Sequence, residues 1–426
     1  MASRSFADLP GDIVRIVADR VSVECRPRMR AVCSAWRAAV PAEPQPWIVL
    51  QPDGDTVSPE GGRRSGFAVL SLTAGVNLSP DSSVVRSLDA FPAGSRCVGA
   101  GHGWLALVGT DDLSVTLLNP VTGRHVSLPP LTKHPIVGGL LEDGRVMWRP
   151  WIDAWTDSGK LAPVEEFVDT FVRKLVFSAS PEQDDYFAVV VGDRMSYAVY
   201  ARAGAAAWET LRFAYGTTVS LVHDVVHVEG GRFLAVTRCH GTVLKLDLAV
   251  QDQNDEEEED FLYHLYSPRV RPFSRPLLST GAYFARGTTP HMHVENYLAL
   301  VDGELYQIWA SWVLSEIDIM VFRGHIVDAG VARFEPQRSP CWSEVTDLGE
   351  WAVLVGKNET VAVHAGDGTA RVRGSYLYFM DSRLEEAVLC AFDLKNGKQV
   401  AACDSEALRW LFNTPPAPVW FLPSLK

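Results

Sequence analysis

The chain has 426 residues, of which 47% are hydrophobic and 10% aromatic, so it can build a packed core and is not disordered over most of its length. Its net charge of −13 is uneven, because residues 1–40 hold seven arginines against four acids and are +3, which leaves −16 for the remainder. An acidic main domain repels phosphate backbones and anionic lipid, so neither nucleic acid nor a membrane surface is an expected partner.

The cysteines indicate an intracellular protein. All seven are scattered without any Cys-x-x-Cys pair, which is typical of reduced thiols. No apolar run approaches the roughly 20 residues that span a bilayer. Asp12, Arg15 and Asp19 interrupt the only apolar stretch near the N-terminus, so a signal peptide is not expected. The expected location is the cytoplasm, the nucleus or both.

Residues 1–40 have the apolar spacing of helices. After Leu9-Pro10, one helical face carries Ile13, Ile16, Val17 and Val21. A second stripe has the spacing i, i+3, i+4, i+7 and consists of Met29, Val32, Cys33 and Trp36. Three prolines then make residues 41–46 a short stiff linker. About 40 residues cannot bury all these apolar groups by themselves, so an exposed remainder predicts a protein partner.

From Trp47 onward the apolar period changes to two. Turn sequences separate strand-like segments at Asn119–Gly123, Gly230-Gly231, His240-Gly241, Asp302-Gly303 and Asn396-Gly397. So many short antiparallel strands must close or cover their edges, and radially arranged four-stranded blades do this. At about 40–50 residues a blade, residues 47–426 predict a β-propeller of roughly six to eight blades. A pair of β-sandwiches is the competing architecture.

Few residues of this β domain indicate a binding or reactive site. The acidic segment 252–260 predicts a solvated surface loop, with electrostatic docking as the alternative. Trp148, Trp151 and Trp155 cluster in a polar, loop-like stretch, and protein-binding propeller faces use such aromatic anchors. We therefore hypothesise that this stretch binds a target protein.

The sequence motifs do not indicate a catalytic site or a metal site. The glycine-rich segment 99–103 leads into a strand, so no helix N-terminus is available for phosphate. His291 and His293 share one strand face but lack a third ligand at a telling spacing. No GxSxG elbow or HExxH helix occurs. We expect no catalytic residue, metal or cofactor, and a propeller hydrolase is the least favoured function.

Two resemblances cover nearly the whole chain. The segment from Leu9 to Val40 resembles an F-box, with its opening Leu-Pro, apolar first helix and closing Val-Cys-x-x-Trp-Arg. The rest resembles the large plant family that carries domain of unknown function 295, a β-propeller type of domain, behind such an F-box. The matching stretches are GHGWLALVGTDDLSVTLLNPVTGRHVSLPPL, RKLVFSASPEQDDYFAVVV, YLALVDGELYQIW, VTDLGEWAVLVGKNETVAV and SYLYFMDSRLEEAVLCAFDLKNGK.

The resemblance implies a three-helix F-box in residues 1–40 and a non-catalytic, substrate-recognition role in an SCF (Skp–cullin–F-box) E3 ubiquitin ligase. The F-box would bind a Skp-type adaptor and through it cullin, while the β domain binds an unknown target protein. The adaptor-binding candidates are Leu9, Pro10, Ile13, Ile16, Val17, Val21, Met29, Val32, Cys33 and Trp36. A binding module that acts outside a ligase is the alternative.

Overall fold

The computed structural model describes most, but not all, of the chain. The described residues are 6, 9–20, 25–40, 46–51, 68–71, 86–87, 91–92, 94–149, 159–192, 197–212, 214–215, 218–219, 221–238, 241–249, 270–274, 292–318, 321–365, 372–381, 388–401 and 418–423. The acidic segment 252–260 lies outside them. No helix in the described part of the chain is long and apolar enough to cross a membrane.

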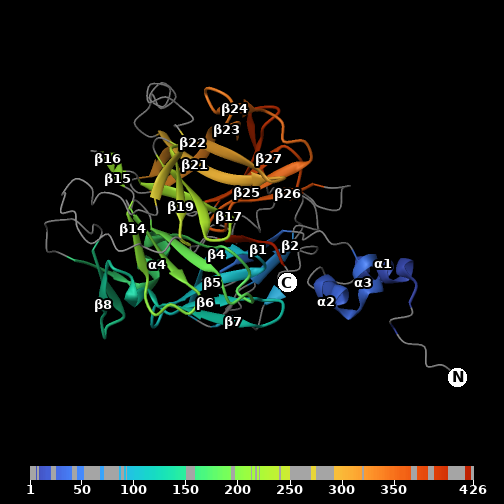
Figure 1. Ribbon diagram of the computed structural model, residues 1–426, viewed down its shortest axis with the longest axis horizontal. Coiled ribbons are helices and arrows are strands. Elements are labelled where there is room, and N and C mark those ends of the chain that lie inside the picture. The colour runs from blue at the N-terminus through green and yellow to red at the C-terminus, as the bar shows by residue number, and fades with distance from the viewer. Residues whose placement is uncertain are drawn as a thin grey trace.

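The chain begins with three short helices, which we call the helical head. They are α1 (Gly11–Arg20), α2 (Cys25–Val32) and α3 (Ser34–Ala39). The second apolar stripe predicted one continuous run, but the structure breaks it at Cys33, which is extended (φ −163°). The Cys33 sulfur accepts a hydrogen bond from the Trp36 backbone N–H at 3.5 Å and so caps α3. The head lies beside the β domain at one end of the molecule (Figure 1).

Six sheets of four or five strands form the ring in the described part of the β domain, and we number them as blades 1 to 6. Blade 1 is β30 (Val419–Phe421), β1 (Trp47–Leu50), β2 (Ala68–Ser71) and β3 (Arg86–Ser87). Blade 2 is β4 (Ser95–Gly101), β5 (Trp104–Gly109), β6 (Val115–Leu118) and β7 (His125–Leu128). Blade 3 is β11 (Val172–Phe177), β12 (Phe187–Gly192), β13 (Tyr197–Arg202) and β14 (Glu209–Arg212).

The second half of the ring continues the series. Blade 4 is β17 (Val222–Glu229), β18 (Arg232–Thr237), β19 (Val243–Asp247) and β20 (Val270–Ser274). Blade 5 is β21 (Met292–Val301), β22 (Glu304–Asp318), β23 (Val321–Phe334) and β24 (Trp342–Val345). Blade 6 is β26 (Val361–His364), β25 (Trp351–Val355), β27 (Tyr376–Asp381), β28 (Val388–Asp393) and β29 (Lys398–Ala401).

The innermost strands follow one another around an axis. Strand β30 lies beside β4, β4 beside β11, β11 beside β17, β17 beside β21, and β21 beside β26. The ring closes because β30 pairs with β1, with Trp47 opposite Phe421 and Val49 opposite Val419. The Tyr378 and Trp420 rings, 6.4 Å apart, join blade 6 to blade 1. The prediction of a mainly β propeller is therefore confirmed, and the pair of sandwiches is wrong.

Turn residues place the hairpins where the sequence predicts them. The glycine just after the first strand of each hairpin has a positive φ, namely Gly123, Gly230, Gly241, Gly303 and Gly397.

Between blades 2 and 3 the chain adds a 3-10 turn (Leu131–Lys133) and a side sheet of β8 (Val137–Leu140), β9 (Arg145–Trp148) and β10 (Lys160–Pro163). A two-stranded ribbon, β15 (Ala214–Tyr215) and β16 (Thr218–Val219), follows blade 3.

One helix, α4 (Val164–Phe171), was not predicted from the sequence. Its apolar positions have the helical spacing i, i+3, i+4, i+7 and are all buried, namely Val164, Phe167, Val168 and Phe171. Pro163 precedes it, and Glu165 and Glu166 occupy the first turn, where the helix dipole favours acids. These signals were present in the sequence, so the helix was predictable.

Ring closure yields a first prediction. Phe421 is fully buried on β30, with its ring centroid 5.6 Å from that of Trp47. We expect Phe421→Ala to lower the free energy of unfolding by about 3–5 kcal/mol, because it opens a cavity at the closing pair. Phe273→Ala removes the same atoms from a side chain that is 38% exposed and serves as the control. Equal losses of the two variants in urea unfolding would contradict a special role for the closing strand.

Candidate functional site

The helical head has a small core of its own. Its buried side chains are Val14, Ala18, Met29, Ala39 and Val40, with Leu9 and Trp36 packed against them. The Trp36 indole N–H donates to the Phe6 carbonyl oxygen at 3.1 Å. The Arg28 guanidinium donates to the Val121 carbonyl oxygen of the propeller at 3.3 Å. The head is therefore packed internally and joined to blade 2 by a polar contact.

Three aliphatic side chains of α1 face solvent instead of this core. Ile13 is 40% exposed, Ile16 48% and Val17 38%. At about 100° per residue they lie on one side of the helix, away from the strip of Val14 and Ala18. Val32, at the end of α2, is 55% exposed. We call Ile13, Ile16, Val17 and Val32 the head surface.

The predicted adaptor-binding residues thus separate into two groups. Pro10 and the four residues of the head surface are exposed, whereas Met29 is buried in the head core. Leu9, Cys33 and Trp36 are half-buried, and Leu9 and Trp36 support that core. Val21 lies outside the described residues. The sequence pattern alone could not divide the set, because the residues of both groups are apolar and follow the same helical spacing.

The proposed tryptophan loop is only partly described. Trp148 ends strand β9 and packs against α4, with its ring centroid 5.7 Å from those of Phe167 and Phe171. The Lys160 ammonium lies 5.9 Å from the Trp148 ring centroid. Trp148 is therefore half-buried, while Trp151 and Trp155 lie outside the described residues, and the target contact of all three stays a prediction.

A buried polar network occupies the axis of the propeller, and sequence reasoning did not predict it. The Asp224 carboxylate accepts hydrogen bonds from the Thr360 hydroxyl (2.8 Å), the Val225 N–H (2.9 Å) and the Leu298 N–H (3.0 Å). It also pairs with the Lys174 ammonium. Asp224, Lys174 and Thr360 are all buried. Burial lowers the pKa of Lys174, and the Asp224 charge opposes that shift.

The residues 356–360, between β25 and β26, bring blade 6 into this network. The Glu359 N–H donates to the Ala100 carbonyl oxygen of β4 at 3.1 Å, and its carboxylate accepts the His227 N–H of β17 at 3.0 Å. The inner strands are also close together nearby, because a Cβ on Gly99 would lie 2.1 Å from the Leu175 carbonyl oxygen. Only glycine fits there. These contacts hold blades 2, 3, 4 and 6 around one short segment.

Burial raises the pKa of Glu359 from an ordinary value of 4.5 to about 7, against the lowering effects of the His227 N–H and Lys174. His102 lies 3.9 Å from this carboxylate, but burial and the neighbouring His227 lower its pKa. The pair is therefore not a strong ion pair at neutral pH. Within the described residues, no three His, Cys, Asp or Glu side chains are grouped to hold a metal ion.

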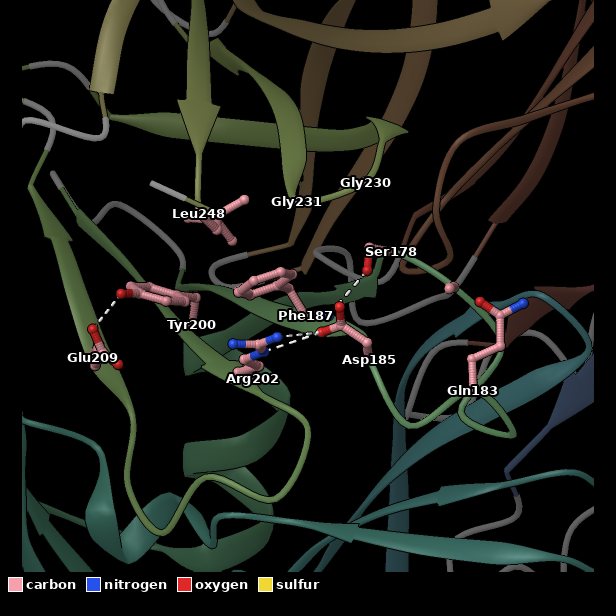
Figure 2. A pocket seen from close by; sticks show the side chains of 12 residues that line it. Ser178, Gln183, Asp185, Phe187, Tyr200, Arg202, Glu209, Gly230, Gly231 and Leu248 are labelled. Carbon is pink, nitrogen blue, oxygen red and sulfur yellow. Dashed lines mark hydrogen bonds and ion pairs between the residues drawn. The ribbon is translucent and has the colours of Figure 1, made fainter. Parts of the chain in front are cut away.

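A cleft of about 520 Å³ opens between blades 3 and 4. Figure 2 shows Phe187 and Tyr200 at its centre, between the Gly230-Gly231 turn and the charged side chains of Asp185, Arg202 and Glu209. Arg202 contacts Asp185 through both Nε and Nη2 at 3.0 Å, and the Tyr200 hydroxyl donates to Glu209. We call this cavity the inter-blade cleft.

The fold and these sites define a β-propeller with a helical head and no described metal centre. The sequence model of the KIB1-4 beta-propeller family matches residues 76–398, which is most of the chain. The protein therefore belongs to the KIB1-4 beta-propeller family.

Solved structures show only distant similarity. Apo AztD from Citrobacter koseri is 10% identical, with 85% of this chain and 84% of that chain covered and a TM-score of 0.29. The Cps50 (Swd1) beta-propeller domain from Myceliophteria thermophila is 11% identical, with coverages of 72% and 85% and a TM-score of 0.27. A functionally unknown protein from Desulfotomaculum acetoxidans is 9% identical, with coverages of 89% and 99% and a TM-score of 0.34. Similarity this low supports no functional inference. No curated protein matched the sequence.

The axial network yields a second prediction. Lys174→Met should lower the free energy of unfolding by about 3–5 kcal/mol, because it leaves the Asp224 charge buried without its cation. The double variant Lys174→Met/Asp224→Asn removes both charges and should recover part of that loss in urea unfolding. A double variant that is less stable than Lys174→Met would contradict the pairing.

Glu359 yields a third prediction, about pH. Because its pKa is higher in the folded protein, the folded state holds a proton that the unfolded state releases above about pH 4.5. This contribution to stability is complete below that pH and is lost as pH rises to about 7. Between about pH 6 and pH 8, wild type should lose about 1 kcal/mol more than Glu359→Gln. Parallel pH dependences of urea unfolding would contradict it.

Proposed function

We propose that the protein is a target-recognition subunit of an SCF ubiquitin ligase, whose helical head is an F-box that binds a Skp-type adaptor. The observation that carries this proposal is the head surface, where Ile13, Ile16 and Val17 face solvent beside a head that already has its own core. Aliphatic groups aligned on one helix face fit a hydrophobic groove of a partner protein.

The energies are sufficient for a protein complex. Burying each aliphatic side chain of the head surface contributes on the order of 1.5–3 kcal/mol. Association and side-chain ordering cost several kcal/mol, so only a well-packed set of anchors yields measurable affinity. Ile13, Ile16, Val17 and Val32 supply such a set without any reactive group.

The propeller then acts as the target-binding platform, in the cytoplasm or the nucleus. In this role the chain needs no catalytic side chain of its own. It raises the effective concentration of a target near the ubiquitin-conjugating enzyme, and that proximity accelerates transfer. The resemblance of residues 9–40 to an F-box and of the β domain to the plant family with domain of unknown function 295 supports this division of roles.

The test is whether the protein still captures the adaptor after charges are introduced into the head surface. Ile13→Asp/Ile16→Asp should abolish co-purification of the Skp-type adaptor and of cullin, because carboxylates cannot enter an apolar interface unpaired. Thermal unfolding of the propeller should not change, since both side chains are exposed.

Leu161→Asp is the matched control, because Leu161 of β10 is 49% exposed and lies on the propeller. It should leave adaptor capture intact. Retained capture by the double variant would overturn the proposal. Capture of the adaptor without cullin by the wild type would favour a binding module that acts outside a ligase.

A further inference from the structure

The inter-blade cleft has an aromatic floor against which a glycine of blade 4 packs. Phe187 and Tyr200 are buried in blade 3 and present their ring surfaces to the cleft, as Figure 2 shows. A Cβ on Gly231 would lie 3.0 Å from the Phe187 ring and 2.9 Å from the Ala249 nitrogen. Gly231 therefore packs directly against the Phe187 ring, and only a small part of each ring reaches the cleft, since Phe187 is 7% exposed and Tyr200 3%.

This floor already holds a cation. The Arg202 guanidinium carbon lies 5.8 Å from the Phe187 ring centroid, which is within the range of a cation–π contact. Asp185 fixes that guanidinium through two contacts of 3.0 Å. Both side chains are well exposed, so the pair forms the wall of the cleft and not its core.

The rim of the cleft is predominantly acidic. Besides Asp185, the described turn between β11 and β12 carries Asp184 and also Glu182, which pairs with Arg124 at 3.0 Å. Glu209 lines the opposite wall, where it accepts the Tyr200 hydroxyl. Arg202 is the one basic side chain that lines the described cleft, so negative charge is in excess. The net charge of −16 on residues 41–426 adds to the attraction of a cation.

We propose that the inter-blade cleft binds a lysine or arginine side chain of a basic segment in the target protein. The aliphatic stem would lie in the cleft beside Leu248 and Ala249, and Asp185 and Glu209 would pair with its charge. The proposal deepens the proposed function, because it assigns a chemical class to the target. Anionic ligands are repelled by the same rim.

The test uses the full chain and two fluorescein-labelled peptides in which glycine alternates with arginine or with glutamate. Fluorescence anisotropy should detect binding of the arginine peptide only. Asp185→Asn/Glu209→Gln should weaken it by at least about tenfold, which corresponds to about 1.4 kcal/mol.

The matched control is Asp143→Asn/Glu344→Gln, which removes the same charge from two exposed carboxylates that do not line the cleft, Glu344 being on β24. Asp143 forms a similar exposed pair with Arg145 on the side sheet, with contacts of 2.8 and 2.6 Å. This control should change the affinity less than about twofold if the cleft, and not the net charge, is the site. Equal weakening by the two double variants would overturn the proposal.

Two substitutions of opposite charge at one position test directly whether the peptide binds in the cleft. Ala249 is exposed and lines the cleft, so Ala249→Arg should fill the cleft with its own cation and abolish peptide binding. Ala249→Glu should retain or strengthen binding. The opposite order, absence of arginine-peptide binding by the wild type, or equal binding of the glutamate peptide would each overturn the proposal. Adaptor capture by these variants should be normal, so a failed cleft and a failed head surface give different results.

Discussion

One carboxylate, that of Asp224, connects four of the six blades. It belongs to blade 4 and binds the Lys174 ammonium of blade 3, the Leu298 N–H of blade 5 and the Thr360 hydroxyl that precedes the inner strand of blade 6. In the low dielectric of the axis, each of these bonds is stronger than in water, and an unfilled one would be costly. The arrangement of the inner strands depends on this satisfied charge.

The axial network also gives the proposed cleft a fixed frame. The inner strands are held by buried polar contacts, so the blade ends that line the cleft are in place before a partner binds. The inter-blade cleft lies at the ends of blades 3 and 4, the two blades that Lys174 and Asp224 join. A rigid frame of this kind presents loops and turns with little loss of entropy on binding.

The fold was largely predictable from local sequence, and the candidate sites were predictable only in part. Turns such as Asp302-Gly303 and Asn396-Gly397 need backbone conformations that few residues adopt, so they mark hairpins reliably. The apolar stripe from Met29 to Trp36 did not show the break at Cys33, because the thiol cap depends on local geometry. Lys174, Asp224 and Glu359 come from distant parts of the chain, and only the closed ring brings them together. The cleft escaped prediction for the same reason.

Ring closure by β30 also has a consequence for synthesis on the ribosome. Strand β1 is made first among the propeller strands, and its partner β30 is made after all five other blades. At about 5–20 residues per second, the edge of β1 therefore stays unpaired for roughly tens of seconds. An open edge is prone to pair with other chains. The nascent propeller thus keeps one strand edge open to pairing with other chains until its last blade emerges.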